Sequence, residues 1–343
     1  MTGYGICYEL LAWIKCFLTE RSQRVVYRSS KSRSSIVRSG VPQGSVLGPL
    51  LFLLYINDLP DVFSGQTHVK MYADDAKIYR VYERHNCISE LQSNLDLFFK
   101  WSEQWQLSIA FNKCQVLHLG YHNLHPVYTL GDSLLQSCNQ VKDLGVIMSS
   151  NLDSTAHCAE IASRATARIG VLFRSFSTKD HRVLVLAYTV YIRPILEYAS
   201  TVWSPHHNKD VDMLESVQAM FTRRLYRRCR LTYTESNLRG EFLALSALVQ
   251  RRQRADLTMC WKLLHGKLNQ SYAELLTLAG DRLSGPSTRS NGYKLAVQRS
   301  RLDVRKFFFS CRVARVWNRL PAIVVSSNTV AAFKVRLDEL QPP

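Results

Sequence analysis

The chain has 343 residues, of which 46% are hydrophobic and 21% charged, a balance typical of a globular protein and not of a disordered one. Its 44 lysines and arginines exceed its 27 acidic residues, and from Ser204 onward 24 basic residues face 11 acidic ones. This excess indicates a polyanionic partner, with a merely basic, soluble surface as the alternative. The nine cysteines form no Cys-x-x-Cys pair, which argues against a zinc ribbon, and no apolar run is long enough to span a bilayer.

The first sixty residues predict a helix over 4–18, two short strands over 23–28 and 35–38, and an apolar helix over 45–57. The two strands and their connection carry five basic residues: Arg24, Arg28, Lys31, Arg33 and Arg38. These side chains could lie along a phosphate backbone, or they could protect the edge of a hairpin by charge. A glycine- and proline-containing loop over 39–45 leads into the apolar helix, and its glycines would let the backbone come close to a ligand.

Residues 68–80 predict a tight β-hairpin that presents the adjacent carboxylates Asp74 and Asp75 at its tip. Two neighbouring acids repel one another unless a cation lies near, and hard oxygen ligands suit Mg²⁺ or Mn²⁺. Phosphoryl transfer is the natural chemistry for such a site. The alternative is an acidic turn whose side chains are merely solvated.

The remaining pattern predicts a helix over 87–107, a strand over 107–120 that carries Lys113, and two or three short strands over 126–150. From about residue 154 the pattern is helical, with helices over 156–176, 179–196, 210–229, 241–264 and 301–317. The third of these helices ends in an arginine-rich stretch over 222–230, whose arginines are expected to spread around the helix and to contact nucleic acid.

Two motifs follow one another along the chain. Residues 39–52 read Ser-Gly-Val-Pro-Gln-Gly-Ser-Val-Leu-Gly-Pro-Leu-Leu-Phe, and residues 72–75 read Tyr-Ala-Asp-Asp. In this order and at this separation they resemble adjacent motifs of the reverse transcriptase palm in non-LTR, LINE-type retrotransposons, particularly those of the jockey group. The resemblance continues through residues 112–114 and 144–146, and more weakly to the Trp-Asn-Arg-Leu-Pro segment at 317–321.

The resemblance implies an α+β fold. It places a partial right-hand polymerase palm, an antiparallel sheet with packed helices, at residues 1–150. A helical thumb would follow at 151–235 and a basic helical carboxy-terminal region at 236–343. The implied activity is Mg²⁺-dependent RNA-directed DNA polymerisation, with an RNA template, a DNA primer and deoxynucleoside triphosphates as partners. Intracellular, nuclear action is implied by the family.

The resemblance also assigns site residues. Asp74 and Asp75 would be catalytic and would hold the metal, and Lys113 would be a general acid for the pyrophosphate leaving group. The other implied sites are the nucleotide and template pocket (Gly40, Pro42, Gln43, Gly44, Tyr72, Ala73), the primer grip (Leu144, Gly145, Val146) and nucleic-acid backbone contacts (Arg223, Arg224, Arg227, Arg228).

The family's first catalytic aspartate lies in an Asp-x-x-x-Ala-Phe-Asp-like segment that the printed sequence does not contain. A two-metal site needs carboxylates from two separate strands. We therefore expect the chain to be the carboxy-terminal portion of a longer polyprotein, from a truncated element or a partial gene. The alternative function is that of a non-catalytic nucleic-acid-binding remnant with the same fold.

Overall fold

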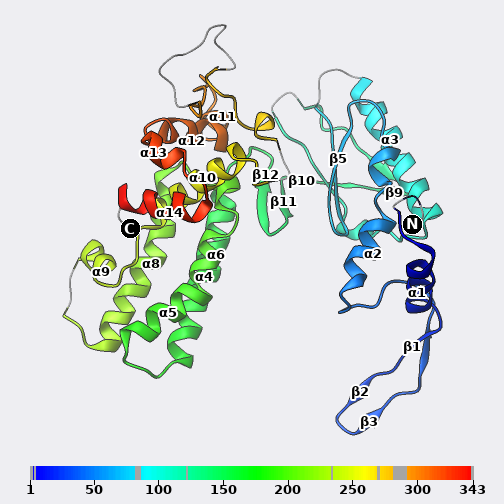
Figure 1. The fold of residues 1–343 in the computed structure, drawn as a ribbon, viewed down its shortest axis with the longest axis horizontal. Helices are drawn as coiled ribbons and strands as arrows, with labels where there is room; N and C mark the ends of the chain where they lie inside the picture. The colour runs from blue at the N-terminus through cyan, green and yellow to red at the C-terminus, as the bar shows by residue number, and fades with distance from the viewer. Residues whose placement is uncertain are drawn as a thin grey trace. The chain divides into compact units, whose positions relative to one another are not determined.

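The computed structural model describes residues 3, 5–81, 86–120, 123–232, 235–268, 271–280 and 292–340. The chain forms two compact units (Figure 1). Unit 1 comprises Met1–Val116 and Tyr121–Ser137, and unit 2 comprises Leu117–Gly120 and Cys138–Pro343. The expected α+β mixture of helices and strands is confirmed, and the described strands pair as separate two-stranded sheets where one antiparallel sheet was expected.

Unit 1 contains three α-helices and several two-stranded sheets among its described residues. The helices are α1 (Tyr8–Leu18), α2 (Leu47–Tyr55) and α3 (Asn86–Gln104). The strands pair as β1 (Arg21–Gln23) with β4 (Ser35–Val37), β2 (Val26–Tyr27) with β3 (Ser30–Lys31), β5 (His68–Tyr72) with β6 (Asp75–Tyr79), β7 (Gln115–Leu117) with β10 (Gln136–Cys138), and β8 (Thr129–Leu130) with β9 (Ser133–Leu134). Two short 3₁₀ helices are η2 (Leu59–Val62) and η3 (Phe111–Lys113).

Helix α3 organises the core of unit 1. Its apolar face supplies Leu95 and Phe98 to a cluster with Tyr128, Leu130 and Leu135. One turn further along, α3 supplies Trp101 to a second cluster, which also holds Trp105, just beyond the helix, and residues of α2, η2 and β5. The predicted helix over 87–107 and the placement of its tryptophans in the core are therefore confirmed.

Two sequence predictions for unit 1 differ from the structure. The strand expected over 107–120 shrinks to β7, and Lys113 lies instead in η3. The backbone amide of Lys113 bonds to the carbonyl of Ala110 at 2.9 Å, because the chain must turn there between α3 and β7. The two strands expected at 23–28 and 35–38 form four short strands, β1 to β4, because the regular strand pairing stops between the pairs Gln23–Ser35 and Val26–Lys31.

Unit 2 begins with a hairpin and continues as helices. Its elements are β11 (Gln140–Asp143), β12 (Val146–Ser149), α4 (Thr155–Ser175), α5 (His181–Tyr191), α6 (Arg193–Glu197), α7 (Ser200–Trp203), α8 (Asn208–Cys229), α9 (Ser236–Phe242), α10 (Leu248–Leu264), η4 (Tyr272–Glu274), α11 (Asp303–Lys306), α12 (Phe309–Trp317), α13 (Ala322–Val325) and α14 (Val330–Leu340). Five short strands, β8 to β12, stand where two or three were expected over 126–150.

The helices of unit 2 enclose two apolar clusters. The first joins β12 with α4, α5, α6 and α8 around fully buried Ile169, Leu184, Tyr188 and Phe221. The second joins α10, α12, α13 and α14 around buried aromatic side chains such as Trp317. The helix expected over 179–196 is split into α5 and α6, because Pro194 has no amide hydrogen to donate and occupies the first turn of a new helix.

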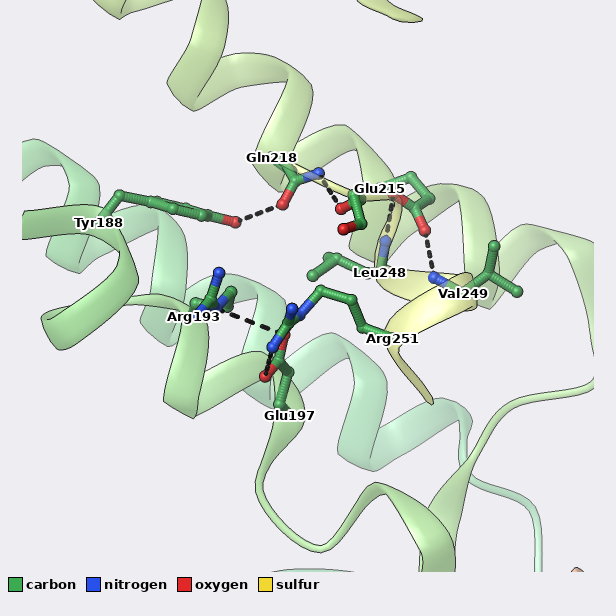
Figure 2. Close-up of polar contacts among 9 residues, drawn as sticks. Tyr188, Arg193, Glu197, Glu215, Gln218, Leu248, Val249 and Arg251 are labelled. Atoms are coloured by element: carbon green, nitrogen blue, oxygen red, sulfur yellow. Dashed lines mark hydrogen bonds and ion pairs between the residues drawn. The ribbon is translucent and has the colours of Figure 1, made fainter. Parts of the chain in front are cut away.

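Helix α10 is fixed to the helices around it by polar contacts. Figure 2 shows the Glu215 carboxylate of α8 accepting hydrogen bonds from the amides of Leu248 (3.2 Å) and Val249 (2.8 Å). Glu215 thereby caps the amino terminus of α10, whose own preceding residue provides no side-chain cap. In the same view Arg251 of α10 pairs with Glu197 of α6. The helix expected over 241–264 therefore begins only at Leu248.

No described helix is long and apolar enough to cross a membrane.

Candidate active site

The β5–β6 hairpin presents one polar and one apolar face. Its register pairs Tyr72 with Asp75, Lys70 with Lys77, and His68 with Tyr79. Directly opposed residues point to the same face, so these six side chains share the exposed face. The other face carries Met71 and Ile78, which pack against the two apolar clusters around α3. The hairpin predicted over 68–80 is thus confirmed, and the side chains of its polar face are exposed.

Asn94 of α3 fixes the chain just before the hairpin. This side chain is 1% exposed. Its Oδ1 accepts from the amide of Ser64 at 2.9 Å, and its Nδ2 donates to the hydroxyl of Thr67 at 3.0 Å and to the carbonyl of Glu90. At the far end of β6, Arg80 pairs with Glu90. Helix α3 therefore holds both ends of the hairpin and leaves its tip exposed.

The two acids occupy the tip. Ala73 and Asp74 form the turn, and Asp75 is the first residue of β6. Ala73 has a φ of 52°, a left-handed conformation that alanine rarely adopts. Both carboxylates are exposed. Their oxygens are hard donors of the kind that Mg²⁺ and Mn²⁺ prefer, but among the described residues no group of three or more His, Cys, Asp or Glu is arranged to hold a metal ion.

The loop before α2 is held at both ends. At its start, Nη2 of Arg21 donates to the carbonyl of Gly40 at 2.6 Å. At its end, the hydroxyl of Ser45 donates to the carbonyl of Pro42 at 2.7 Å and accepts from the amide of Gly48 at 3.0 Å. A Cβ on Gly48 would lie 2.8 Å from the Pro42 oxygen, so only glycine lets the loop fold back on the helix.

The middle of this loop is open. Gly40 and Gly44 have φ values of 77° and 81°, and a Cβ built on either would meet no atom within 4 Å. Gln43 is exposed between them. Because the backbone here is uncovered and held only at its two ends, the loop can receive a ligand without displacing other parts of unit 1.

The loop and the hairpin tip are joined through the core of unit 1. Phe52 of α2 and Ile56, which directly follows this helix, belong to the same apolar cluster as Met71 of β5. No hydrogen bond links described residues 40–44 with residues 72–75. Lys113, the third predicted catalytic residue, is exposed at the end of η3.

In unit 2, the turn between β11 and β12 carries the predicted primer grip. Asp143 pairs with Val146, so Leu144 and Gly145 form a two-residue turn. Both have positive φ, 45° and 86°, as a type I′ turn requires. The Tyr198 hydroxyl donates to the carbonyl of Leu144 at 3.1 Å. The turn is therefore braced by the segment that follows α6, with the Leu144 side chain 45% exposed.

The hairpin carrying this turn is anchored by Val146 and His157. Val146 is buried in the apolar cluster of α4 and α8. The amide of Ile147 donates to Nδ1 of His157 at 3.2 Å. Burial lowers the pKa of His157, which favours the neutral ring that this hydrogen bond needs.

The four arginines near the end of α8 fall into two groups. Arg223, Arg224 and Arg227 are exposed and line a shallow hollow together with Met220. Arg228 instead donates to the carbonyls of Phe173 (2.7 Å) and Phe176 (2.9 Å) at the end of α4. The arginines were expected to spread around the helix, but those three share one side of it, because positions three and four apart are neighbours on a helix.

Residues 2–148 match the sequence model of the family described as reverse transcriptase (RNA-dependent DNA polymerase). This reverse transcriptase segment contains the loop, the acidic hairpin, η3 and the Leu144–Gly145 turn. No solved structure matches the chain.

Several curated proteins of mobile elements are similar to the chain. It is 29% identical over 233 residues to the "RNA-directed DNA polymerase from mobile element jockey" of Drosophila funebris, which covers 63% of this chain and 25% of that protein. It is 28% identical over 214 residues to the "Probable RNA-directed DNA polymerase from transposon X-element" of Drosophila melanogaster, covering 60% and 24%. The chain thus spans about a quarter of the length of these relatives.

Sequence reasoning did not find four residues that position parts of the candidate site: Arg21, Ser45, Asn94 and Tyr198. Ser45 lies inside the loop motif, three residues before Gly48, and that spacing is the usual signal of a serine that bonds the first turn of a helix. Asn94 interrupts the apolar pattern of α3, and a buried amide is normally hydrogen-bonded. Arg21 and Tyr198 left no signal, because their partners are backbone carbonyls distant in sequence.

Proposed function

We propose that the protein is part of an RNA-directed DNA polymerase of a non-LTR retrotransposon and that unit 1 supplies part of its nucleotidyl-transfer site. One observation carries this proposal. The reverse transcriptase segment presents two adjacent carboxylates at the exposed tip of a hairpin whose other face and both ends are held by the core. In this proposal unit 1 is part of the palm, and α4 to α8 form the thumb.

Asp74 and Asp75 would hold Mg²⁺, or Mn²⁺ in its place. When bound, the metal would neutralise charge that develops on the transferred phosphoryl group. The two acids come from one hairpin, so a carboxylate from another strand is needed to bracket a second ion. Among the described residues β5 and β6 pair only with each other, which leaves their outer edges able to receive that strand. The exposed ring of Tyr72, directly opposite Asp75, would contact the nucleotide or the primer end.

The loop over 40–44 would bind the incoming deoxynucleoside triphosphate and the templating base. Its two glycines leave the backbone open, Pro42 fixes the turn, and Gln43 provides a polar side chain. Lys113 would donate a proton from Nζ to the pyrophosphate leaving group, whose oxygens gain charge as the bond breaks.

The nucleic acid would be held by unit 2. Arg223, Arg224 and Arg227 are exposed on one side of α8, and their guanidinium groups would contact phosphates of the template and primer. We do not include Arg228 in this set because it is bonded to the end of α4. The exposed turn at Leu144–Gly145 would support the primer terminus, close to the backbone where glycine has no side chain.

The test is primer extension on a homopolymeric RNA template with Mg²⁺ or Mn²⁺. The chain is assayed alone and together with a fingers–palm segment, carrying the first catalytic aspartate, from one of the similar retrotransposon proteins. Asp74→Asn and Asp75→Asn keep the size of each side chain and remove its charge. Asp61→Asn, an exposed acid in η2, is the matched control.

We expect primer extension in the supplemented reaction. Either tip variant, Asp74→Asn or Asp75→Asn, should lower the extension rate at least a hundredfold, and the Asp61→Asn control should change it little. Extension that is equal in the tip and control variants would overturn the proposal. Silence in every mixture, with salt-sensitive RNA binding retained, would instead support the non-catalytic binding remnant.

A further inference from the structure

Residues 21–38 form a basic arm in unit 1. Figure 1 shows β1 to β4 as a long hairpin that extends away from α1 and α2. Every side chain from 22 to 36 is exposed, including Val25, Tyr27 and Ile36, which are each about 70% exposed. A two-stranded ribbon with no covered face is only marginally stable in water. The arm is therefore a surface that gains stability when a partner covers it.

The charge of the arm is of one sign. Six of its residues are basic (Arg21, Arg24, Arg28, Lys31, Arg33 and Arg38), and no acidic residue occurs from Arg21 to Asn57. Arg21 is engaged at the base, where it bonds to the carbonyls of Leu18 and Gly40. The other five are exposed. A polyanion would neutralise their mutual repulsion.

The strand register gathers three of these charges on one face of the arm, which also carries Val26. Val26 pairs with Lys31, and Tyr27 pairs with Ser30. The next pair is Val25 and Ser32, because the Ser32 amide donates to the carbonyl of Val25 at 2.9 Å and the Ser32 hydroxyl accepts from the Val25 amide. Alternation along each strand then places Arg24, Lys31 and Arg33 on one face of the ribbon.

A bulge lies beside this basic face. Gln23 pairs with Ser35, so Arg24 stands opposite two residues, Arg33 and Ser34. Bulges of this kind bend and twist a ribbon, and the hydroxyl of Ser32 closes this one by donating to the carbonyl of Arg33 at 3.0 Å. The two arginines are thus held at the same level of the arm, across from one another.

The tip of the arm combines a ring with a cation. Arg28 has a φ of 54°, and its guanidinium lies over the Tyr27 ring, 5.4 Å from the centroid. The ring is on the face opposite Arg24, Lys31 and Arg33. Proteins that bind single-stranded nucleic acid combine phosphate-binding cations with an exposed aromatic ring on which a base stacks.

We infer that the arm binds a single strand of RNA, with Arg24, Lys31 and Arg33 on its phosphates and Tyr27 at an unpaired base. The inference rests on the proposed function for the choice of RNA as the polyanion. Protection of a hairpin edge by charge would also explain basic residues in the arm. It does not explain why Arg24, Lys31 and Arg33 share a face, or why an exposed aromatic ring lies near the tip of the arm.

The test measures binding of the full chain to a fluorescently labelled single-stranded RNA at several salt concentrations, without divalent metal or nucleotides. The arm variant combines Arg24→Gln, Lys31→Gln and Arg33→Gln. The control variant combines Lys100→Gln, Arg168→Gln and Arg182→Gln, which removes two arginines and one lysine from other exposed positions. A third variant, Arg24→Lys with Arg33→Lys, keeps the charge of the arm. Poly-glutamate serves as a competitor.

We expect the arm variant to bind RNA at least tenfold more weakly. Its plot of log affinity against log salt should be less steep by about 2, since each lost contact to a single strand contributes about 0.7. The control variant and the lysine variant should bind nearly as well as the parent chain. Equal binding by the arm and control variants, or displacement of RNA by poly-glutamate of equal charge, would overturn the inference.

The outcome is separate from that of primer extension because no metal or nucleotide is present. If the chain fails to polymerise but binds RNA through the arm, the inference about the arm stands and the proposed function is wrong. If the chain polymerises but the arm variant binds RNA as well as the parent chain, the proposed function stands and the inference about the arm is wrong.

Discussion

Leu144 has a left-handed backbone conformation, with a positive φ, that a leucine rarely adopts. With Gly145 it forms a turn in which both residues have positive φ, and asparagine, aspartate or glycine is usual at the first position. A leucine there carries a conformational cost of about 1 kcal/mol and exposes nearly half of its side chain. Its retention is explained if the side chain contacts a ligand, which agrees with the proposed role in supporting the primer.

The two residues of this turn should respond to substitution in opposite directions. Leu144→Asn should raise the free energy of unfolding by about 0.5 kcal/mol, because asparagine tolerates the left-handed conformation. Gly145→Ala should lower it by about 1–2 kcal/mol, because alanine does not and its Cβ would lie 3.4 Å from a ring carbon of Tyr198. Urea denaturation measures both, and a destabilising Leu144→Asn would show that the leucine is there for packing.

At the level of the element, α10 is tied to two helices of the second apolar cluster of unit 2 by ion pairs that differ in burial. Asp256 makes two hydrogen bonds of 2.8 Å to Arg312 of α12, and both side chains are mostly buried. Burial raises the pKa of Asp256 despite the arginine that opposes the shift. Arg254 makes a similar two-bond pair with Asp338 of α14, but there 36% and 40% of the side chains are exposed.

These two pairs provide a matched comparison of buried and exposed charge. Arg312→Gln should cost about 3–5 kcal/mol of unfolding free energy, because it leaves Asp256 buried without its cation. Arg254→Gln should cost less than about 1 kcal/mol, because water solvates the remaining Asp338. Chemical denaturation of the two variants measures both losses of unfolding free energy. Equal losses would mean that the difference in burial between the two ion pairs has no effect on stability.

The elements that sequence reasoning predicted well are those with a strong local pattern. Helix α3 was predicted by apolar residues three and four apart, and the β5–β6 hairpin by two apolar and aromatic runs around Asp74 and Asp75. The start of α10 was missed because its cap, Glu215, comes from α8. The division of the arm into β1 to β4 was missed because the Ser32 hydroxyl, and not a regular ladder, closes its centre.

The candidate site was predictable to a similar extent. The order of the loop and hairpin motifs was sufficient to indicate the family, whose sequence model matches residues 2–148. Which arginines of α8 remain available could not be read from the sequence, since Arg228 differs from its neighbours only by the carbonyls of α4 that lie within its reach. The difference between Arg228 and the other three arginines is therefore set by contacts between segments distant in sequence, which a local pattern does not show.

For the whole molecule, we propose that the acidic hairpin of unit 1 binds metal and that the basic surfaces bind nucleic acid. The arm in unit 1 and the three arginines on α8 in unit 2 are both exposed, whereas Arg251, Arg254 and Arg312 are paired with acids inside unit 2. Much of the positive charge of α10 and α12 is therefore structural.

The central claim is that a divalent cation binds at Asp74 and Asp75, and Fe²⁺ tests it most directly. With ascorbate and peroxide, Fe²⁺ that replaces Mg²⁺ cleaves the polypeptide near its site, and the fragments can be sized. We expect cleavage around residues 72–77 that is suppressed by excess Mg²⁺, abolished in the Asp74→Asn/Asp75→Asn double variant and retained in Asp61→Asn. Cleavage that is absent from the hairpin tip, or unchanged in the double variant, would contradict it.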